Sequence, residues 1–150
     1  MKNVFDAATV VELKQRMAQL QPESSALWGS MGVAQALAHC SAGIEMVQGK
    51  ILPKRVFIGR IIGPAVKRMV LKDEAPIKKN SPTADELVIR DERDLIVERA
   101  RLSGLMEEVA AAGPAGCTAH PHPFFGKMTA EEWSVLMYKH LDHHLRQFGV

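Results

Sequence analysis

The chain has little of what marks several common protein classes. Its 150 residues include only two cysteines, Cys40 and Cys117, and only 5% aromatic residues. Two cysteines without CxxC spacing exclude a disulfide framework and agree with a reducing cytoplasm. The first residues also lack the long apolar region of a signal peptide. We therefore expect a cytoplasmic protein whose hydrophobic residues, 47% of the chain, form one domain over residues 1–150.

The chain also lacks a dominant charge and a long apolar run. A net charge of +2 with 24% charged residues creates no global field, so no nucleic-acid partner is expected. The longest apolar stretch, residues 56–71, is interrupted by basic residues, whereas a membrane span needs about 20 predominantly apolar residues. No membrane span is expected. Residues 50–79 could still associate with a membrane surface, although most segments of this kind pack on their own domain. This possibility ranks below the two functions considered below.

The chain has helical periodicity. Apolar residues recur at spacings of three and four, and no long run alternates between apolar and polar residues as a strand does. Four long helices are predicted at about residues 6–20, 30–49, 83–112 and 129–148. Thr83 with Glu86, and Thr129 with Glu132, form the capping-box patterns that mark the starts of the last two. Leu87 and Asp91 are predicted to begin the inward stripe of the third helix.

The segment between the second and third helices is less regular. Pro53 could open a shorter helix, Gly63-Pro64 should kink or split it, and the residues up to Pro82 are polar. The predicted fold class is therefore all-α: a four-helix bundle with a long, partly helical crossover between helices 2 and 3.

Two histidines one helical turn apart, His140 and His144, are the most informative residues. Together with Trp133 and Met137 they form one stripe of the last helix, which should face the core. Histidines at this spacing present their ring nitrogens to a common point, as in helical zinc sites. A third ligand should come from the inward stripe of another helix, and His39 meets this condition best. Three imidazoles with an open fourth position are typical of a catalytic divalent site.

Two segments resemble the DinB/YfiT-like superfamily. Residues 28–39 (WGSMGVAQALAH) and 138–149 (YKHLDHHLRQFG) carry the resemblance, together with Pro82-Thr83. Residues 122–128 (HPFFGKM) resemble one branch of it, a domain of unknown function. The resemblance covers most of the chain and implies a four-helix bundle that holds a divalent metal.

The ligands that the resemblance implies are His39, His140 and His144, the same three that the helical stripes select. Three histidines suit zinc, nickel or iron, so the ligands do not identify the metal. Better understood members of the superfamily are thiol transferases or thiol-dependent isomerases. The resemblance therefore implies that metal-activated water or a low-molecular-weight thiol attacks a small electrophile, as in a thiol transferase or a metal-dependent hydrolase.

A non-catalytic protein is the alternative to this enzyme. In that case the helical bundle binds a small ligand or serves as a dimerisation module, and its metal is structural. The expected partners are a small-molecule substrate, with a low-molecular-weight thiol as one candidate, and a second copy of the chain in a homodimer.

Three polar residues are expected beside the ligands. His143 is rotated by about 100° from the neighbouring His144, which assigns it to the pocket or to the support of a ligand. Gln147 lies one turn from His144 and can reach the same face. Gln35 precedes His39 by one turn, where its amide could orient a metal-bound water or satisfy a backbone carbonyl.

Other residues have less specific assignments. His122 lies in a proline-rich loop, where it could be solvated or, if the loop folds over the end of the bundle, act as a fourth ligand or general base. Asp142 is assigned to the surface and Cys40 to the core. Trp28 and Trp133 are predicted to be core anchors at the starts of their helices.

Overall fold

The structure, a computed structural model of residues 1–150, is helical and contains no strand. Its elements are α1 (Ala7–Met17), α2 (Val33–Val47), α3 (Phe57–Leu71), α4 (Leu95–Ala112) and α5 (Ala130–Gln147), with short 3₁₀ helices η1 (Asp85–Leu87) and η2 (Gly113–Gly116). None of the helices combines the length and apolar character needed to cross a membrane. The predicted all-α class is confirmed.

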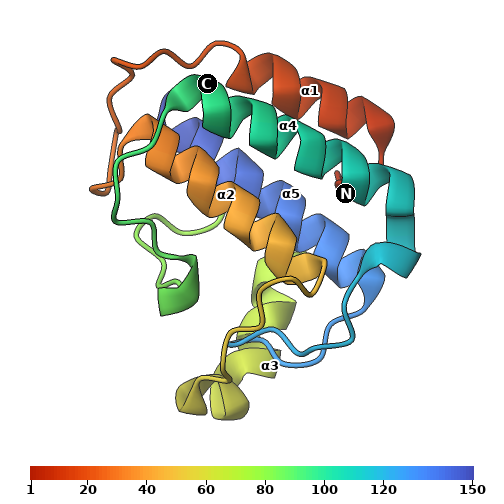
Figure 1. The fold of residues 1–150 in the computed structure, drawn as a ribbon. Coiled ribbons are helices and arrows are strands. Elements are labelled where there is room, and N and C mark those ends of the chain that lie inside the picture. The colour runs from red at the N-terminus through yellow and green to blue at the C-terminus, as the bar shows by residue number, and fades with distance from the viewer.

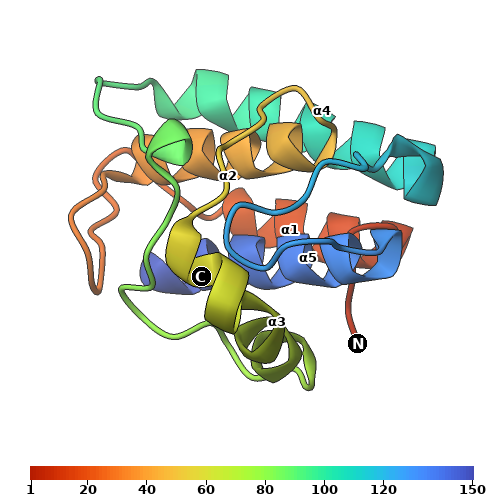
Figure 2. The same cartoon turned by 90° about the horizontal axis from the view of Figure 1, so that it is seen from below.

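Four of the five helices pack side by side (Figure 1). Both α1 and α2 contact both α4 and α5. Seen from below, α2 and α4 form one layer and α1 and α5 the other, while α3 crosses outside them (Figure 2). This is the arrangement expected of a four-helix bundle, with α3 as the helical part of the crossover.

The starts of α1 and α5 follow from local capping. Asp6 accepts a hydrogen bond from the backbone N–H of Ala8, and Thr129 and Glu132 complete both bonds of a capping box. These bonds satisfy N–H groups that have no partner inside the helix. Both predicted starts are confirmed.

The predicted start of the third long helix is wrong. The helix α4 begins at Leu95, because the Asp94 carboxylate caps it by accepting from Val97 N–H at 2.9 Å. Glu86, the expected capping partner of Thr83, instead accepts from the backbone N–H of Lys54.

Two details near the bundle end also differ from the sequence pattern. Leu87 is buried as predicted, but it lies in η1, and Asp91 is exposed rather than inward. The helix α2 starts at Val33 rather than near Ser30, because the Gln35 side chain accepts from Gly32 N–H.

Of the predicted kink or split at Gly63-Pro64, the split does not occur, because α3 continues through Pro64. Gly59 and Gly63, one turn apart, lie against the backbone of Phe124. A Cβ atom at Gly59 would come within 2.5 Å of the Phe124 carbonyl oxygen, and one at Gly63 would come closer still. The glycines therefore permit close contact between α3 and the loop before α5, rather than ending the helix.

Replacing Gly63 by alanine is expected to lower the free energy of unfolding by about 1–3 kcal/mol, the usual cost of overpacking. The new methyl group would meet a backbone carbonyl, which cannot rotate away. The matched control is Gly104→Ala on α4, where a Cβ meets nothing within 4 Å, so it should stabilise the helix slightly. Urea denaturation measures both variants, and a stabilised Gly63→Ala protein would contradict the close contact.

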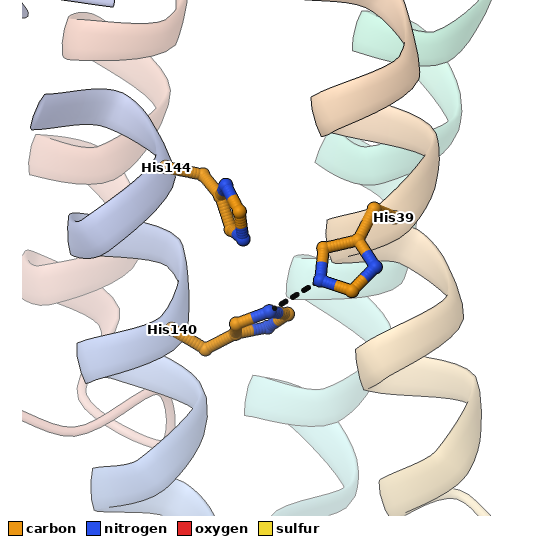
Figure 3. Close-up of side chains that lie close together, drawn as sticks. All are labelled: His39, His140 and His144. Carbon is orange, nitrogen blue, oxygen red and sulfur yellow. Dashed lines mark hydrogen bonds between the residues drawn. The ribbon is translucent and has the colours of Figure 1, made fainter. Parts of the chain in front are cut away.

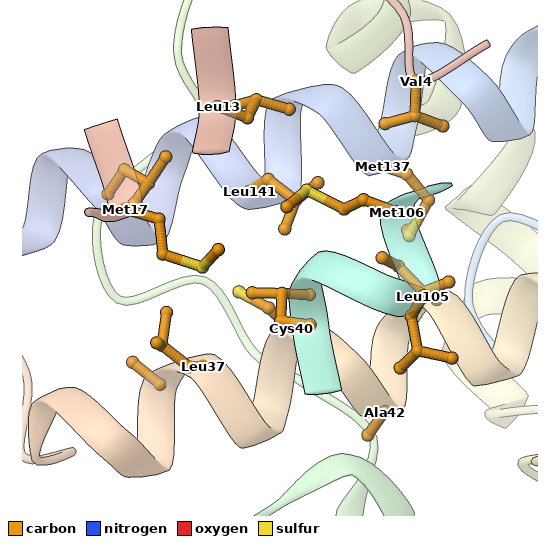
Figure 4. Close-up of a cluster of buried hydrophobic side chains, with 14 of the residues drawn as sticks. Val4, Leu13, Met17, Leu37, Cys40, Ala42, Leu105, Met106, Met137 and Leu141 are labelled. Atoms are coloured by element: carbon orange, nitrogen blue, oxygen red, sulfur yellow. The ribbon is translucent and has the colours of Figure 1, made fainter. Parts of the chain in front are cut away.

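The core lies between the four packed helices (Figure 4). Leu13 and Met17 of α1 meet Cys40 of α2, Met106 of α4 and Leu141 of α5, and all five are buried. Each large side chain contributes about 1.5–3 kcal/mol by leaving water. Cys40 is the small core residue that the sequence predicts, and burial raises the pKa of its thiol. This packing holds α2 and α5 with the histidine-bearing faces toward each other.

Candidate metal centre

Three histidines from two helices meet between α2 and α5 (Figure 3). His39 comes from α2, and His140 and His144 come from successive turns of α5. Their ring centroids lie 4.8 to 4.9 Å apart, and one nitrogen atom of each ring falls within 4.8 Å of the others. His39 and His144 are buried, and His140 keeps partial exposure. The structure thus brings the three predicted ligands together.

Two of the rings are oriented by carbonyl oxygens. The Nδ1 atom of His39 lies 2.7 Å from the Leu87 carbonyl oxygen, which can only accept, so His39 Nδ1–H donates. The Nδ1 atom of His144 lies 2.8 Å from Oε1 of Gln147, while Nε2 of Gln147 donates to the carbonyl oxygen of Trp28. The second bond fixes the amide so that its oxygen faces His144. Both histidines therefore keep an Nε2 lone pair, the arrangement that supports metal-bound imidazoles.

The third ring lies directly against the backbone of α2. Nε2 of His140 is 2.9 Å from Nε2 of His39, and Nδ1 of His140 is buried without a partner. A Cβ atom at Gly43 would lie 3.0 Å from that Nδ1, so glycine makes room for the ring. A cation between the rings would replace the histidine–histidine hydrogen bond with three nitrogen ligands. The residues present therefore fit a metal ion.

The electrostatics of the cluster keep its imidazoles neutral. Burial lowers the pKa of His39, and burial together with the neighbouring His39 lowers the pKa of His144 to about 3. Burial and the surrounding histidines hold the pKa of His140 well below its ordinary value. Neutral imidazole is the form that binds metal, so no proton needs to be displaced near pH 7.

The rim of the cluster is formed by residues far apart in the sequence. His143 lies beside His144, and its Nδ1 is 3.2 Å from the Ile77 carbonyl oxygen. The ring of Trp28 lies 5.5 Å from that of His143, and Nζ of Lys79 is 4.5 Å from the Trp28 centroid. Trp28 is half-buried here, so its prediction as a core anchor is wrong. No spacing in the sequence signals that Trp28, Lys79 and His143 meet.

The two glutamines differ in their relation to the cluster. Gln147 reaches the face of His144, as predicted, and supports that ring. The amide of Gln35 accepts from Gly32 N–H and donates to the Asp91 carbonyl oxygen. Of the two roles considered for Gln35, the structure shows the bond to a backbone carbonyl.

Replacing Gln147 by leucine is expected to weaken metal binding by about 10- to 100-fold, the usual cost of losing the group that orients a ligand. The His144 Nδ1–H would lose its only acceptor, and the ring its fixed orientation. Gln35→Leu is the matched control, because that amide bonds only to backbone groups outside the cluster. Competition with a metal-sensitive dye measures both affinities. Equal losses in the two variants would show that Gln147 has no specific role.

His122 belongs to the loop before α5. Its Nδ1 accepts from the backbone N–H groups of Phe124 and Phe125, both at 3.1 Å, so its proton resides on Nε2. The ring stacks on Phe125 and lies 5.5 Å from Trp133. It is not among the three histidines whose nitrogen atoms converge. His122 therefore organises the loop, and the structure does not place it as a fourth ligand.

The buried neutral state of His122 predicts a pH dependence of stability. Burial and the nearby Arg55 lower its pKa to about 4, whereas an unfolded histidine titrates near its ordinary value of 6.5. The unfolded state binds more protons between these values, so stability is full above 6.5 and falls as the pH drops toward 4. His122→Asn keeps an acceptor for the loop but does not titrate.

We expect the metal-free His122→Asn protein to lose about 1–2 kcal/mol less than the wild type between about pH 7 and pH 5. Urea denaturation in a chelating buffer measures the difference. Identical pH profiles for the two proteins would contradict a neutral His122.

Asp142 corrects another prediction. It is only 5% exposed, although the sequence assigned it to the surface. Its carboxylate pairs with Arg16 of α1 at 2.8 Å and with Arg146, one turn later, at 2.7 Å. The pairing with Arg16 joins α1 to α5, so the sequence pattern of α5 alone could not reveal it. Asp142 therefore ties α5 to α1 on the side away from the histidines.

The fold and the site together define an all-helical protein with a buried three-histidine cluster suited to a divalent metal. The chain belongs to the family described as Protein of unknown function (DUF1569), whose family model matches residues 5–149. This match agrees with the domain of unknown function that the sequence resembles. Comparison with curated proteins and comparison with solved structures each give no match.

Proposed function

We propose that this protein is a divalent-metal-dependent enzyme of the DinB-like type. His39, His140 and His144 would hold the ion, which zinc, nickel or iron could supply. Water or a low-molecular-weight thiol would attack a small electrophile, as in a thiol transferase or a hydrolase. A bound divalent ion would lower the pKa of such a water or thiol and so provide a nucleophile near neutral pH.

The observation that carries this proposal is the pair of Nδ1–H bonds to carbonyl oxygens. Leu87 and Gln147 supply those oxygens to His39 and His144, and each bond leaves one lone pair directed into the cluster. A histidine that served only to fill the core would need partners for both nitrogens. Here Nε2 of His39 has only Nε2 of His140 as its hydrogen-bond partner, and one nitrogen of each of the three rings converges on the others.

The chain's own residues would prepare the site in three ways. Burial of His39 and His144 keeps the rings neutral and excludes water from that side. The absence of a side chain at Gly43 lets the ring of His140 lie close to α2. Trp28 and His143, at the rim, would contact a small substrate as it approaches.

A structural metal site in a non-catalytic protein is the competing function. A structural zinc site is usually closed by four protein ligands. The group of converging histidines, cysteines and carboxylates has only three members, and His122 uses its Nδ1 within its own loop. An open position favours the enzyme, because it admits an exchangeable ligand.

Cobalt substitution tests whether the site is open. The protein would be loaded with Co²⁺ and titrated with a low-molecular-weight thiol, and an open site should show saturable thiolate-to-cobalt charge-transfer absorption. The same titration of His144→Ala is the control for unspecific cobalt–thiol complexes. Loading without any response to thiol or to small anions would favour the structural site.

Turnover is then measured with the metal-loaded protein, a thiol and an activated aryl halide. Catalysis that disappears with a chelator and returns with the metal would support the enzyme.

A further inference from the structure

The helix α3 lies outside the four packed helices (Figure 1), and it exposes large apolar side chains. Phe57 is 75% exposed, Ile61 63% and Met69 61%, and Ile58 and Ile62 are exposed as well. Isolated exposed apolar residues are ordinary, but five on one helix of 15 residues indicate an interaction surface. We name this patch the α3 apolar face.

The glycines on the opposite side fix the direction of this face. Gly59 and Gly63 are buried against the backbone of Phe124, so that side of α3 is held to the bundle. At about 100° per residue, the exposed apolar residues between Phe57 and Ile62 cover an arc of about 140° directed away from that contact. The α3 apolar face therefore has no partner within the chain.

The segment that carries this face is basic. Residues 50–72 contain seven of the chain's 19 Lys and Arg residues and none of its 17 Asp and Glu residues. Lys67 pairs with Glu132 of α5, whereas Arg60 and Arg68 on α3 pair with no carboxylate. The remainder of the chain has more acidic than basic residues, so the basic character is concentrated where the apolar side chains are exposed.

We propose that α3 docks on an anionic phospholipid surface. Phe57, Ile61 and their neighbours would enter the boundary between headgroups and acyl chains, and Arg60 and Arg68 would lie among the phosphates. Basic amphipathic helices with exposed Phe and Ile residues bind membranes in this way, lying in the interface rather than crossing it.

Charge complementarity favours lipid over a second copy of the chain. A symmetric contact through α3 would set Arg60 and Arg68 of one subunit against the same residues of the other, because both subunits use the same patch in a twofold interface. An anionic lipid surface instead offers the opposite charge at high density. The docking depends only on α3, and the histidine cluster takes no part in it.

Co-sedimentation of the full chain with vesicles tests the proposal. We expect binding to vesicles of mixed phosphatidylglycerol and phosphatidylcholine, and none to pure phosphatidylcholine. Phe57→Ser with Ile61→Ser, and separately Arg60→Gln with Arg68→Gln, should each weaken binding by about tenfold or more, and added salt should weaken wild-type binding. Helical content measured by circular dichroism verifies that these surface variants remain folded.

The matched control replaces two equally prominent apolar residues elsewhere. Ile96 and Val97 on α4 are exposed, so Ile96→Ser with Val97→Ser removes similar apolar surface without touching α3. This variant should bind vesicles as the wild type does.

Three results would overturn the proposal. One is the absence of binding to anionic vesicles, and another is an equal loss in the α4 control. The third is a dimer, seen by analytical ultracentrifugation, that the Phe57→Ser/Ile61→Ser variant converts to a monomer, because that would make α3 the contact between two copies.

Discussion

Replacing His39 by alanine is expected to abolish metal binding. His39 is the only ligand that α2 contributes, so its loss leaves two histidines on one helix and opens the shell. The affinity for the metal should fall by more than about 100-fold. A loss of about 100-fold is already the largest usual effect of removing a group that only supports a ligand, and His39 is itself a ligand. His140→Ala should have the same effect, since each variant removes one of three nitrogen ligands.

Elemental analysis of protein purified without a His-tag or chelating column measures this effect. We expect about one equivalent of a divalent metal in the wild type and in His120→Ala, and none in His39→Ala or His140→Ala. His120 is the matched control, because it lies in a loop and is not one of the converging histidines. Wild-type protein that stays metal-free after incubation with zinc, nickel, iron and manganese under reducing conditions would contradict the proposed metalloenzyme.

Truncating Trp133 to alanine is expected to cost about 3–5 kcal/mol of folding free energy, the usual penalty for emptying a large buried aromatic site. Trp133 is 1% exposed, faces the core from the first turn of α5 and lies near the ring of His122. The same change at Trp28 should cost much less, because that side chain is half-buried at the rim. Chemical denaturation of the two variants provides the comparison.

The two tryptophan substitutions should also differ in their effect on ligand binding. Trp28→Ala removes an aromatic surface beside His143 and should alter the affinity for small ligands of the metal-loaded protein. Equal losses of stability in both variants would contradict the placement of Trp28 at the rim.

Local signals in the sequence predicted much of the fold. Asp6 and Thr129 start helices because the side chains that cap them lie within three residues of the N–H groups they satisfy. The Thr83 pattern has the same form but fails, because Glu86 bonds to Lys54 and Asp94 caps the helix instead. A capping motif predicts a helix start only when no tertiary contact competes for its residues.

The site, too, could be predicted where one helix carries the signal, and not where a tertiary contact decides. His140 and His144 could be predicted because one helix holds both, and His39 because its neighbours are apolar or small. Gln147 was expected on the face of His144, but the Leu87 carbonyl that orients His39 and the Trp28 carbonyl that fixes Gln147 could not be predicted, since they belong to the backbone and carry no side-chain signature. Asp142 was missed for a related reason, because Arg16 approaches it from another helix.

The bond from His39 to Leu87 affects how this protein can change over evolution. The acceptor is a main-chain oxygen in η1, so other apolar side chains that fill the same buried space at position 87 could preserve it. An insertion or deletion in the connection between α3 and α4 would instead shift that oxygen and rotate the imidazole. Relatives that retain the site should therefore tolerate substitution at position 87 more readily than a change in the length of the segment that leads to Asp94.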